Sequence, residues 1–69
     1  MEVFKLETDE FIKLNDLLKS MRLCDTGGMA NTVIAGGQVK VNGRVELRKR
    51  CKIRAGQIVE FEGHKITIT

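Results

Sequence analysis

The sequence of 69 residues has no proline, tryptophan or tyrosine, and its aromatic rings are three phenylalanines and one histidine. Phe4, Phe11 and Phe61 each fall in an apolar pattern that predicts a core position. The sequence therefore shows no set of exposed rings on which single-stranded bases would stack. If the chain binds nucleic acid, this scarcity favours recognition of folded shape and phosphates over recognition of stacked bases.

Cysteine and histidine are also scarce, with Cys24, Cys51 and His64 as the full set. Structural zinc usually takes four ligands, so neither a metal nor another cofactor is expected. No nucleophile and base pair is evident, which predicts a non-enzymatic protein in which His64 lies in a hairpin turn. Both cysteines are expected to be small packing residues with free thiols.

Long apolar runs are missing as well. No segment approaches the roughly 18 residues of a membrane span, and Met1–Lys5 lacks the basic and apolar regions of a signal peptide. We therefore expect a cytoplasmic protein. The length and the 42% hydrophobic content predict one folded domain over residues 1–69.

Positive charge is abundant in one place. Residues 40–54 contain seven of the twelve Lys and Arg residues and a single acid, Glu46. Residues 1–39 carry four bases against six acids, and residues 55–69 carry one against two. A concentrated cationic surface attracts polyanions, of which nucleic acid is the commonest in cells.

Two helices are predicted ahead of this stretch. Residues 8–10, Thr-Asp-Glu, suit a helix start, and apolar residues recur with helical spacing from Phe11 to Met21. A second helix should begin at Asp25-Thr26, both good capping types, and end at Gly36-Gly37. Gly27 and Gly28 lower the helix propensity of its first turn.

Strands follow, because the periodicity changes to two. Residues 39–41 and 44–46 alternate around Asn42-Gly43, which favours a hairpin with a type I′ turn. A second hairpin is predicted from residues 58–61 and 65–68, and Val3–Leu6 is a candidate extra strand. The expected fold class is α+β, with two short helices packed on a small, mainly antiparallel sheet of about four to five strands.

Residues 37–43, Gly-Gln-Val-Lys-Val-Asn-Gly, resemble the signature of the S-four RNA-binding domain, a family named after the fourth protein of the small ribosomal subunit. Lys13–Leu18 is similar to the family's first-helix pattern, Ala30 falls at its small helix-two position, and residues 55–59 resemble the start of its later strand. The resemblance covers about residues 11–61 and is greatest to the small stand-alone bacterial members.

This resemblance implies an αL arrangement whose basic face docks on structured RNA, commonly ribosomal or transfer RNA. One departure concerns the start of the second helix, where the family usually has Ser-Arg and this chain has Thr26-Gly27. An arginine that often contacts RNA is therefore missing, and we expect the extra basic charge at residues 48–54 to compensate.

Alternation defines the candidate interface. Lys40 should face solvent between two inward valines, and Arg50, Lys52 and Arg54 should share one side of an extended strand from Arg48 to Arg54. Lys13 is added because it matches a family position. The predicted RNA-binding residues are Lys13, Lys40, Asn42, Arg44, Arg48, Lys49, Arg50, Lys52 and Arg54.

The sequence thus predicts a monomer that binds structured RNA without catalysis, with ribosomal RNA or the ribosome first and transfer RNA second. A simple solvated face is the plainest alternative, and a basic protein-interaction module that docks on an acidic partner is another. DNA binding is less favoured, because Asn31 is the one evident base-reading side chain of the second helix. A sulfur carrier is disfavoured, because such carriers end in Gly-Gly and this chain ends in Ile68-Thr69.

Overall fold

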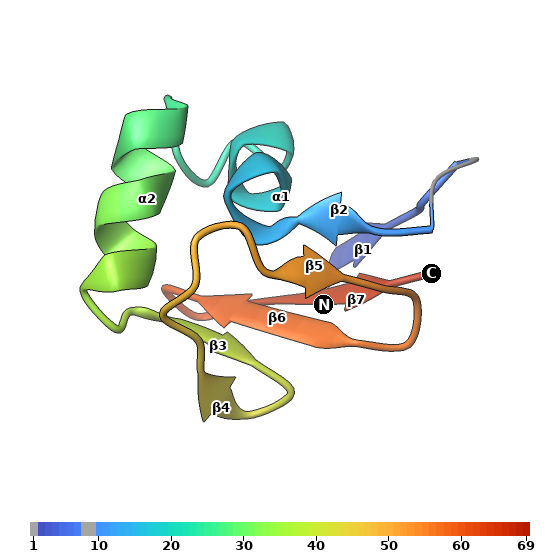
Figure 1. The fold of residues 1–69 in the computed structure, drawn as a ribbon. Helices are drawn as coiled ribbons and strands as arrows, with labels where there is room; N and C mark the ends of the chain where they lie inside the picture. The colour runs from blue at the N-terminus through green and yellow to red at the C-terminus, as the bar shows by residue number, and fades with distance from the viewer. Residues whose placement is uncertain (1, 8–9) are drawn as a thin grey trace.

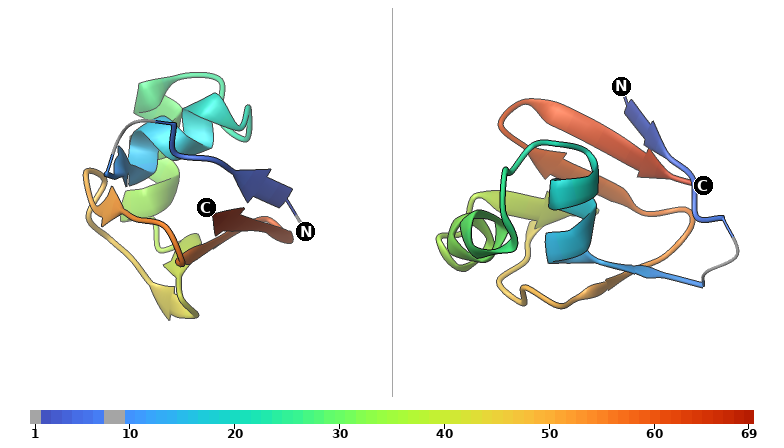
Figure 2. Two further views of the ribbon diagram at one scale, coloured as in Figure 1. Left: turned by 90° about the vertical axis from the view of Figure 1, so that its right-hand side faces the viewer. Right: turned by 90° about the horizontal axis from the view of Figure 1, so that it is seen from above.

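The computed structural model describes residues 2–7 and 10–69, and it places two helices on one face of a five-stranded sheet (Figures 1 and 2). The sheet order is β1-β7-β6-β3-β4, with β1 and β7 parallel and the other pairs antiparallel. A separate ribbon pairs β2 with β5 antiparallel. The predicted fold class is confirmed, although the ribbon was not expected. The elements are β1 (Glu2–Phe4), β2 (Ile12–Lys13), α1 (Leu14–Ser20), α2 (Gly27–Ala35), β3 (Val39–Val41), β4 (Arg44–Val45), β5 (Lys52–Ile53), β6 (Ile58–Phe61) and β7 (His64–Ile68).

The core lies between the helices and the sheet. Both helices supply buried aliphatic side chains, and the inner faces of β3, β6 and β7 supply the opposing layer. Ile53 of the ribbon is also fully buried, so the ribbon is attached to the same core. No polar side chain is buried among the described residues. The buried set is Leu14, Leu17, Leu18, Cys24, Ala30, Val33, Ile34, Val39, Val41, Ile53, Val59, Phe61, Ile66 and Ile68.

Helix α1 begins at Leu14, so the predicted start at residues 8–10 is wrong. Thr8 and Asp9 lie outside the described residues, and Glu10 precedes the strand β2. Ile12 and Lys13 pair with β5, which keeps this segment extended until the helix begins. Lys13 is the N-cap and gives no side-chain hydrogen bond to the helix. The predicted apolar stripe is confirmed in part, because Leu14, Leu17 and Leu18 are fully buried whereas Phe11 precedes the helix.

Helix α2 follows the prediction at both ends. The Thr26 hydroxyl accepts a hydrogen bond of 3.0 Å from the backbone N–H of Met29, which satisfies one of the unpaired amides of the first turn. Gly36 is the C-cap and Gly37 has a φ of +77°, the left-handed conformation in which glycine commonly ends a helix. Within the described residues, neither helix is long and apolar enough to cross a membrane.

Both hairpins have two-residue turns with positive φ angles. Asn42 and Gly43 have φ values of 52° and 83°, as a type I′ turn requires. Glu62 and Gly63 have values of 49° and 81° in the second hairpin. The prediction of a longer second turn is wrong, because His64 is the first residue of β7 and pairs with Phe61.

Thr26→Ala should destabilise the fold, because it removes the hydroxyl that caps α2. The expected loss in the free energy of unfolding is about 1 kcal/mol, measured by urea denaturation. Ser20→Ala is a matched control, since no side-chain hydrogen bond is recorded for Ser20 at the end of α1. Equal stability of the two variants would contradict a capping role for Thr26.

Candidate nucleic-acid interface

The segment between β4 and β5, residues 46–51, is named here the basic loop. Figure 1 shows it rising from the sheet to the beginning of α1 before it enters β5. The N–H of Leu14 donates a hydrogen bond of 2.9 Å to the carbonyl of Cys51, and the N–H of Asn15 donates one of 3.0 Å to the carbonyl of Lys49. Backbone carbonyls of the basic loop therefore satisfy the first two amides of α1, and the side-chain oxygen of Asn15 accepts a hydrogen bond of 2.9 Å from the N–H of Asp16.

The two hydrogen bonds to α1 orient the basic loop and therefore its charged side chains. Two of its carbonyls are directed at the helix, whereas the side chains of Arg48, Lys49 and Arg50 are exposed. The predicted extended strand from Arg48 to Arg54 is wrong in its extent. Only Lys52–Ile53 pairs as a strand, and residues 49–50 form a turn, because the chain bends to reach α1.

Glu46 anchors the start of the basic loop. Its carboxylate accepts hydrogen bonds from the backbone N–H and Nε of Arg48, both at 3.0 Å, and from Nη2 at 3.1 Å. These bonds from Arg48 lower the pKa of Glu46 to about 2 and raise that of Arg48. The Glu46 side chain is 17% exposed and the Arg48 side chain 77% exposed. The guanidinium is thus held in place while much of its surface stays open to a ligand.

Cys51 completes this cluster. Its Sγ lies 3.6 Å from Oε1 of Glu46 and 3.6 Å from Nη2 of Arg48. Burial and the nearby Glu46 raise the pKa of the Cys51 thiol. Burial also raises the pKa of Cys24, with Glu62 and Asp25 adding to the effect. Both cysteines are free, and the raised pKa values of their thiols favour packing over nucleophilic chemistry.

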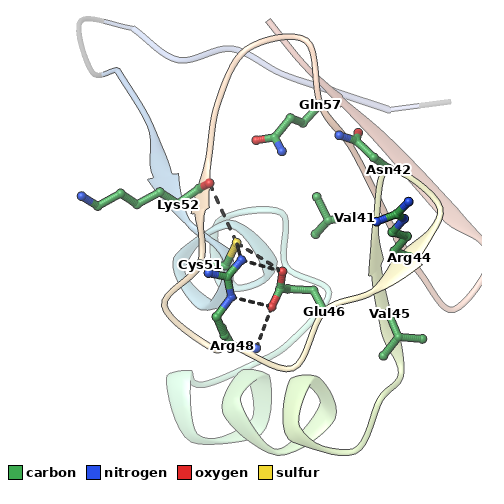
Figure 3. Close-up of a pocket in the computed structure, with 9 residues that line it drawn as sticks. All are labelled: Val41, Asn42, Arg44, Val45, Glu46, Arg48, Cys51, Lys52 and Gln57. Atoms are coloured by element: carbon green, nitrogen blue, oxygen red, sulfur yellow. Dashed lines mark hydrogen bonds and ion pairs between the residues drawn. The ribbon is translucent and has the colours of Figure 1, made fainter.

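A groove of about 600 Å³, named here the basic groove, separates the hairpin β3–β4 from the basic loop. Figure 3 shows Glu46, Arg48 and Cys51 joined by hydrogen bonds, with Asn42 and Arg44 contributed by the hairpin. A smaller hollow of about 420 Å³ is lined by Arg48, Arg50, Cys51 and Lys52. The basic groove is lined by Val41, Asn42, Arg44, Val45, Glu46, Arg48, Cys51, Lys52 and Gln57.

The ribbon of β2 and β5 gathers a second set of predicted residues. Lys13 pairs directly with Lys52 across the ribbon, although like charges at such positions repel. The ammonium of Lys52 lies 4.9 Å from the centroid of the Phe11 ring, and Cζ of Arg54 lies 5.6 Å from it. Lys52 borders the basic groove through its backbone, but Figure 3 shows its side chain directed away from the other groove residues.

Phe11 departs from the prediction that all three phenylalanines are core residues. Phe61 is buried and Phe4 packs against the core, whereas Phe11 is half-buried and is not part of the core cluster. Phe11, Ile12 and Lys13 show no alternation of apolar and polar residues, and the helical spacing from Phe11 to Leu14 favoured a helix here.

Two predicted residues have other environments. Lys40 is exposed as predicted, but it lies on the sheet face opposite the core, where it pairs in register with Glu60. The side-chain oxygen of Asn42 accepts a hydrogen bond of 2.9 Å from the N–H of Ile58. Asn42 therefore joins the hairpin to β6 and offers its amide N–H groups to a ligand.

Three further side chains have structural partners. The side-chain oxygen of Gln57 accepts a hydrogen bond of 2.6 Å from the N–H of Arg54, and so closes the turn before β6. The side-chain oxygen of Asn31 accepts one of 3.0 Å from Asn15, which joins the helices. Asn31 is thus engaged within the protein, which weakens the case for DNA reading. In the described parts of the chain no cluster of three His, Cys, Asp or Glu residues could hold a metal ion.

Acidification should test the anchoring role of Glu46. A carboxylate whose pKa is lowered from 4.5 to about 2 stabilises the fold above pH 4.5, and this contribution is lost as the pH falls to about 2. Glu46→Gln should therefore flatten the fall in the free energy of unfolding over this range, measured by urea denaturation. Glu10→Gln serves as an exposed-acid control, and an unchanged slope in Glu46→Gln would refute the anchoring role.

A known relative of this chain shares its fold, and the name of that relative refers to RNA binding. YbcJ of Escherichia coli (strain K12), named a putative RNA-binding protein, is 48% identical over 68 residues, which are 99% of this chain and 97% of that protein. YbcJ of Shigella flexneri matches to the same extent. The solution structure of E. coli YbcJ, described as revealing an αL motif involved in RNA binding, has a TM-score of 0.76 and covers 100% of this chain and 87% of its own.

The family expected from the sequence matches along nearly the whole chain. Its S4 domain spans residues 4–69, which includes both helices, the basic loop and the ribbon. The chain belongs to the S4 domain family.

Proposed function

We propose that this protein binds structured RNA without catalysing a reaction, with ribosomal RNA as its first target and transfer RNA as its second. The observation that carries the proposal is the basic groove. Arg44 lines it from the hairpin and Arg48 from the basic loop, and the basic loop is held in place by hydrogen bonds to α1. A cationic concave surface with a fixed backbone suits a phosphate backbone of defined shape.

Preorganisation distinguishes this surface from an ordinary charge run. A flexible lysine-rich loop would lose conformational entropy on binding, whereas the basic loop is already ordered by the Leu14, Asn15 and Arg48 hydrogen bonds. The guanidinium of Arg48 is also oriented by Glu46 and can give bidentate contacts that lysine cannot.

Two further observations support the proposal. YbcJ, the E. coli relative at 48% identity, carries a name that refers to RNA binding, and its solution structure is described in terms of an αL motif involved in it. The raised pKa values of Cys24 and Cys51 disfavour thiolate chemistry at the groove. The ring nitrogen Nδ1 of His64 contacts Glu2 at 3.0 Å on the far strand pair, so the histidine is not a groove residue.

The alternative of a protein-interaction module has one observation in its favour. Val45 and Leu47 beside the groove are 52% and 60% exposed, which gives the basic surface an apolar margin. A complex recovered with this protein that survives nuclease treatment would favour that alternative. Loss of the complex with nuclease would favour RNA binding.

Reversing Lys49 and Arg50 together to Glu should weaken binding to purified ribosomal RNA and lower the salt slope of the affinity by about two, because each base is expected to contact one phosphate. Both side chains are exposed, so the fold should persist. Affinity would be measured by fluorescence anisotropy across a salt series, with transfer RNA and duplex DNA as competitors.

The matched control is the pair Lys5→Glu and Lys19→Glu, which makes the same change in net charge at exposed positions outside both the basic loop and the groove. Equal loss in both double variants would mean that net charge alone drives binding. Binding of duplex DNA as tightly as ribosomal RNA at moderate salt would contradict selection of RNA.

Gly27→Arg should restore the basic residue that the family usually has at the start of its second helix. A Cβ at Gly27 would meet no atom within 4 Å, so the side chain can be added without a clash. The expected result is tighter RNA binding and a salt slope steeper by about one. Gly27→Ala is the control for helix propensity, and equal affinity of the two variants would show that this end of α2 does not face the RNA.

A further inference from the structure

The outward face of the ribbon has a composition found nowhere else among the described residues. Ile53 is fully buried and Ile12 packs against the core, so the alternating residues of both strands face outward. These residues are Phe11, Lys13, Lys52 and Arg54, one aromatic ring among three cations.

The ring of Phe11 has surroundings unlike those of the other two phenylalanines. Phe61 is 2% exposed, and Phe4 and Phe11 are both half-buried, but Phe4 packs against the core cluster whereas the neighbours of Phe11 are the flexible cations Lys52 and Arg54. An exposed cation over a ring contributes only about two- to fivefold to an equilibrium. Stacking of a nucleobase on an aromatic ring contributes about five- to 150-fold. A base can therefore displace either cation from the ring.

We propose that Phe11 is a stacking platform for one unpaired nucleobase of the bound RNA, with Lys13, Lys52 and Arg54 contacting the phosphates beside it. This inference rests on the proposed function and adds a specificity to it. The basic groove reads phosphates of the folded RNA, and the ribbon face requires a base that has left the helical stack.

The chemistry of the ring favours a base over an acidic peptide. The face of an aromatic ring carries partial negative charge, so it repels a carboxylate and accepts the face of a flat heterocycle. Bases inside an A-form helix expose only their edges, so only an extruded or unpaired base can cover the ring. Lys52 borders the basic groove through its backbone and extends its side chain to the ribbon face, so the two surfaces are neighbours on the protein.

The first experiment compares two RNA hairpins that differ by a single unpaired adenosine in the stem. The unchanged protein should bind the bulged hairpin more tightly than the fully paired one, and Phe11→Leu should weaken binding to the bulged hairpin by about five- to 150-fold while leaving the paired one unaffected. Met29→Leu, at a residue 43% exposed on α2, is the matched control.

A second variant reports on stacking directly through its fluorescence and does not rely on a change in affinity. The chain contains no tryptophan, so Phe11→Trp introduces one indole whose fluorescence should be quenched by the bulged hairpin. The same hairpin with an abasic bulge should leave the fluorescence unchanged. Urea denaturation of Phe11→Leu and Phe11→Trp checks that both remain folded.

The outcomes separate this inference from the proposed function. Equal binding of bulged and paired hairpins by the unchanged protein, with no quenching in Phe11→Trp, overturns the stacking site and leaves groove binding intact. Failure of the unchanged protein to bind either hairpin at low salt overturns both. Equal dependence on Phe11 in binding poly-glutamate would assign the ribbon face to an acidic protein partner and also overturn the stacking site.

Discussion

The two hydrogen bonds between the start of α1 and the carbonyls of Lys49 and Cys51 support most of the molecule's functional geometry. A helix of seven residues is too short to persist on its own. Its first amides need acceptors, and the basic loop supplies them. The loop in turn obtains its path from the helix, so neither element has its conformation alone. The same contacts direct the cationic side chains outward and place the ribbon beside α1.

Features that depend on residues close together in the sequence could be predicted from it. Asn42-Gly43 and the Thr26 cap act within four residues, and both hairpins and α2 were therefore predicted. The start of α1 was missed because it depends on pairing with β5, about forty residues away in the sequence. The ribbon, and with it the half-buried position of Phe11 outside the core, was missed for the same reason. His64 was misplaced because a two-residue and a three-residue turn differ by one position.

The features of the candidate site likewise divide into those that could be predicted from the sequence and those that could not. Exposure of the predicted cations follows from simple alternation or from a local charge run, but their grouping does not. Arg44 and Arg48 share the basic groove because the basic loop returns to α1, whereas Lys52 extends to Phe11 on the ribbon and Lys40 lies on the opposite face of the sheet. The S4 domain family supplies the fold, and the binding proposed for this chain comes from side chains placed on that fold. The chain lacks an arginine at Gly27 and carries its basic charge at the loop and the ribbon instead.

The pairing of Lys13 with Lys52 makes the ribbon an element whose own cohesion depends on the surrounding ions. Its two residue pairs must hold together although Lys13 and Lys52, which carry like charges, are directly opposite in register. Any anion that settles there replaces repulsion with attraction. By thermodynamic linkage, binding of an anion at the ribbon and ordering of the ribbon then favour each other. A bound phosphate would thus be a structural component of the protein as well as its ligand.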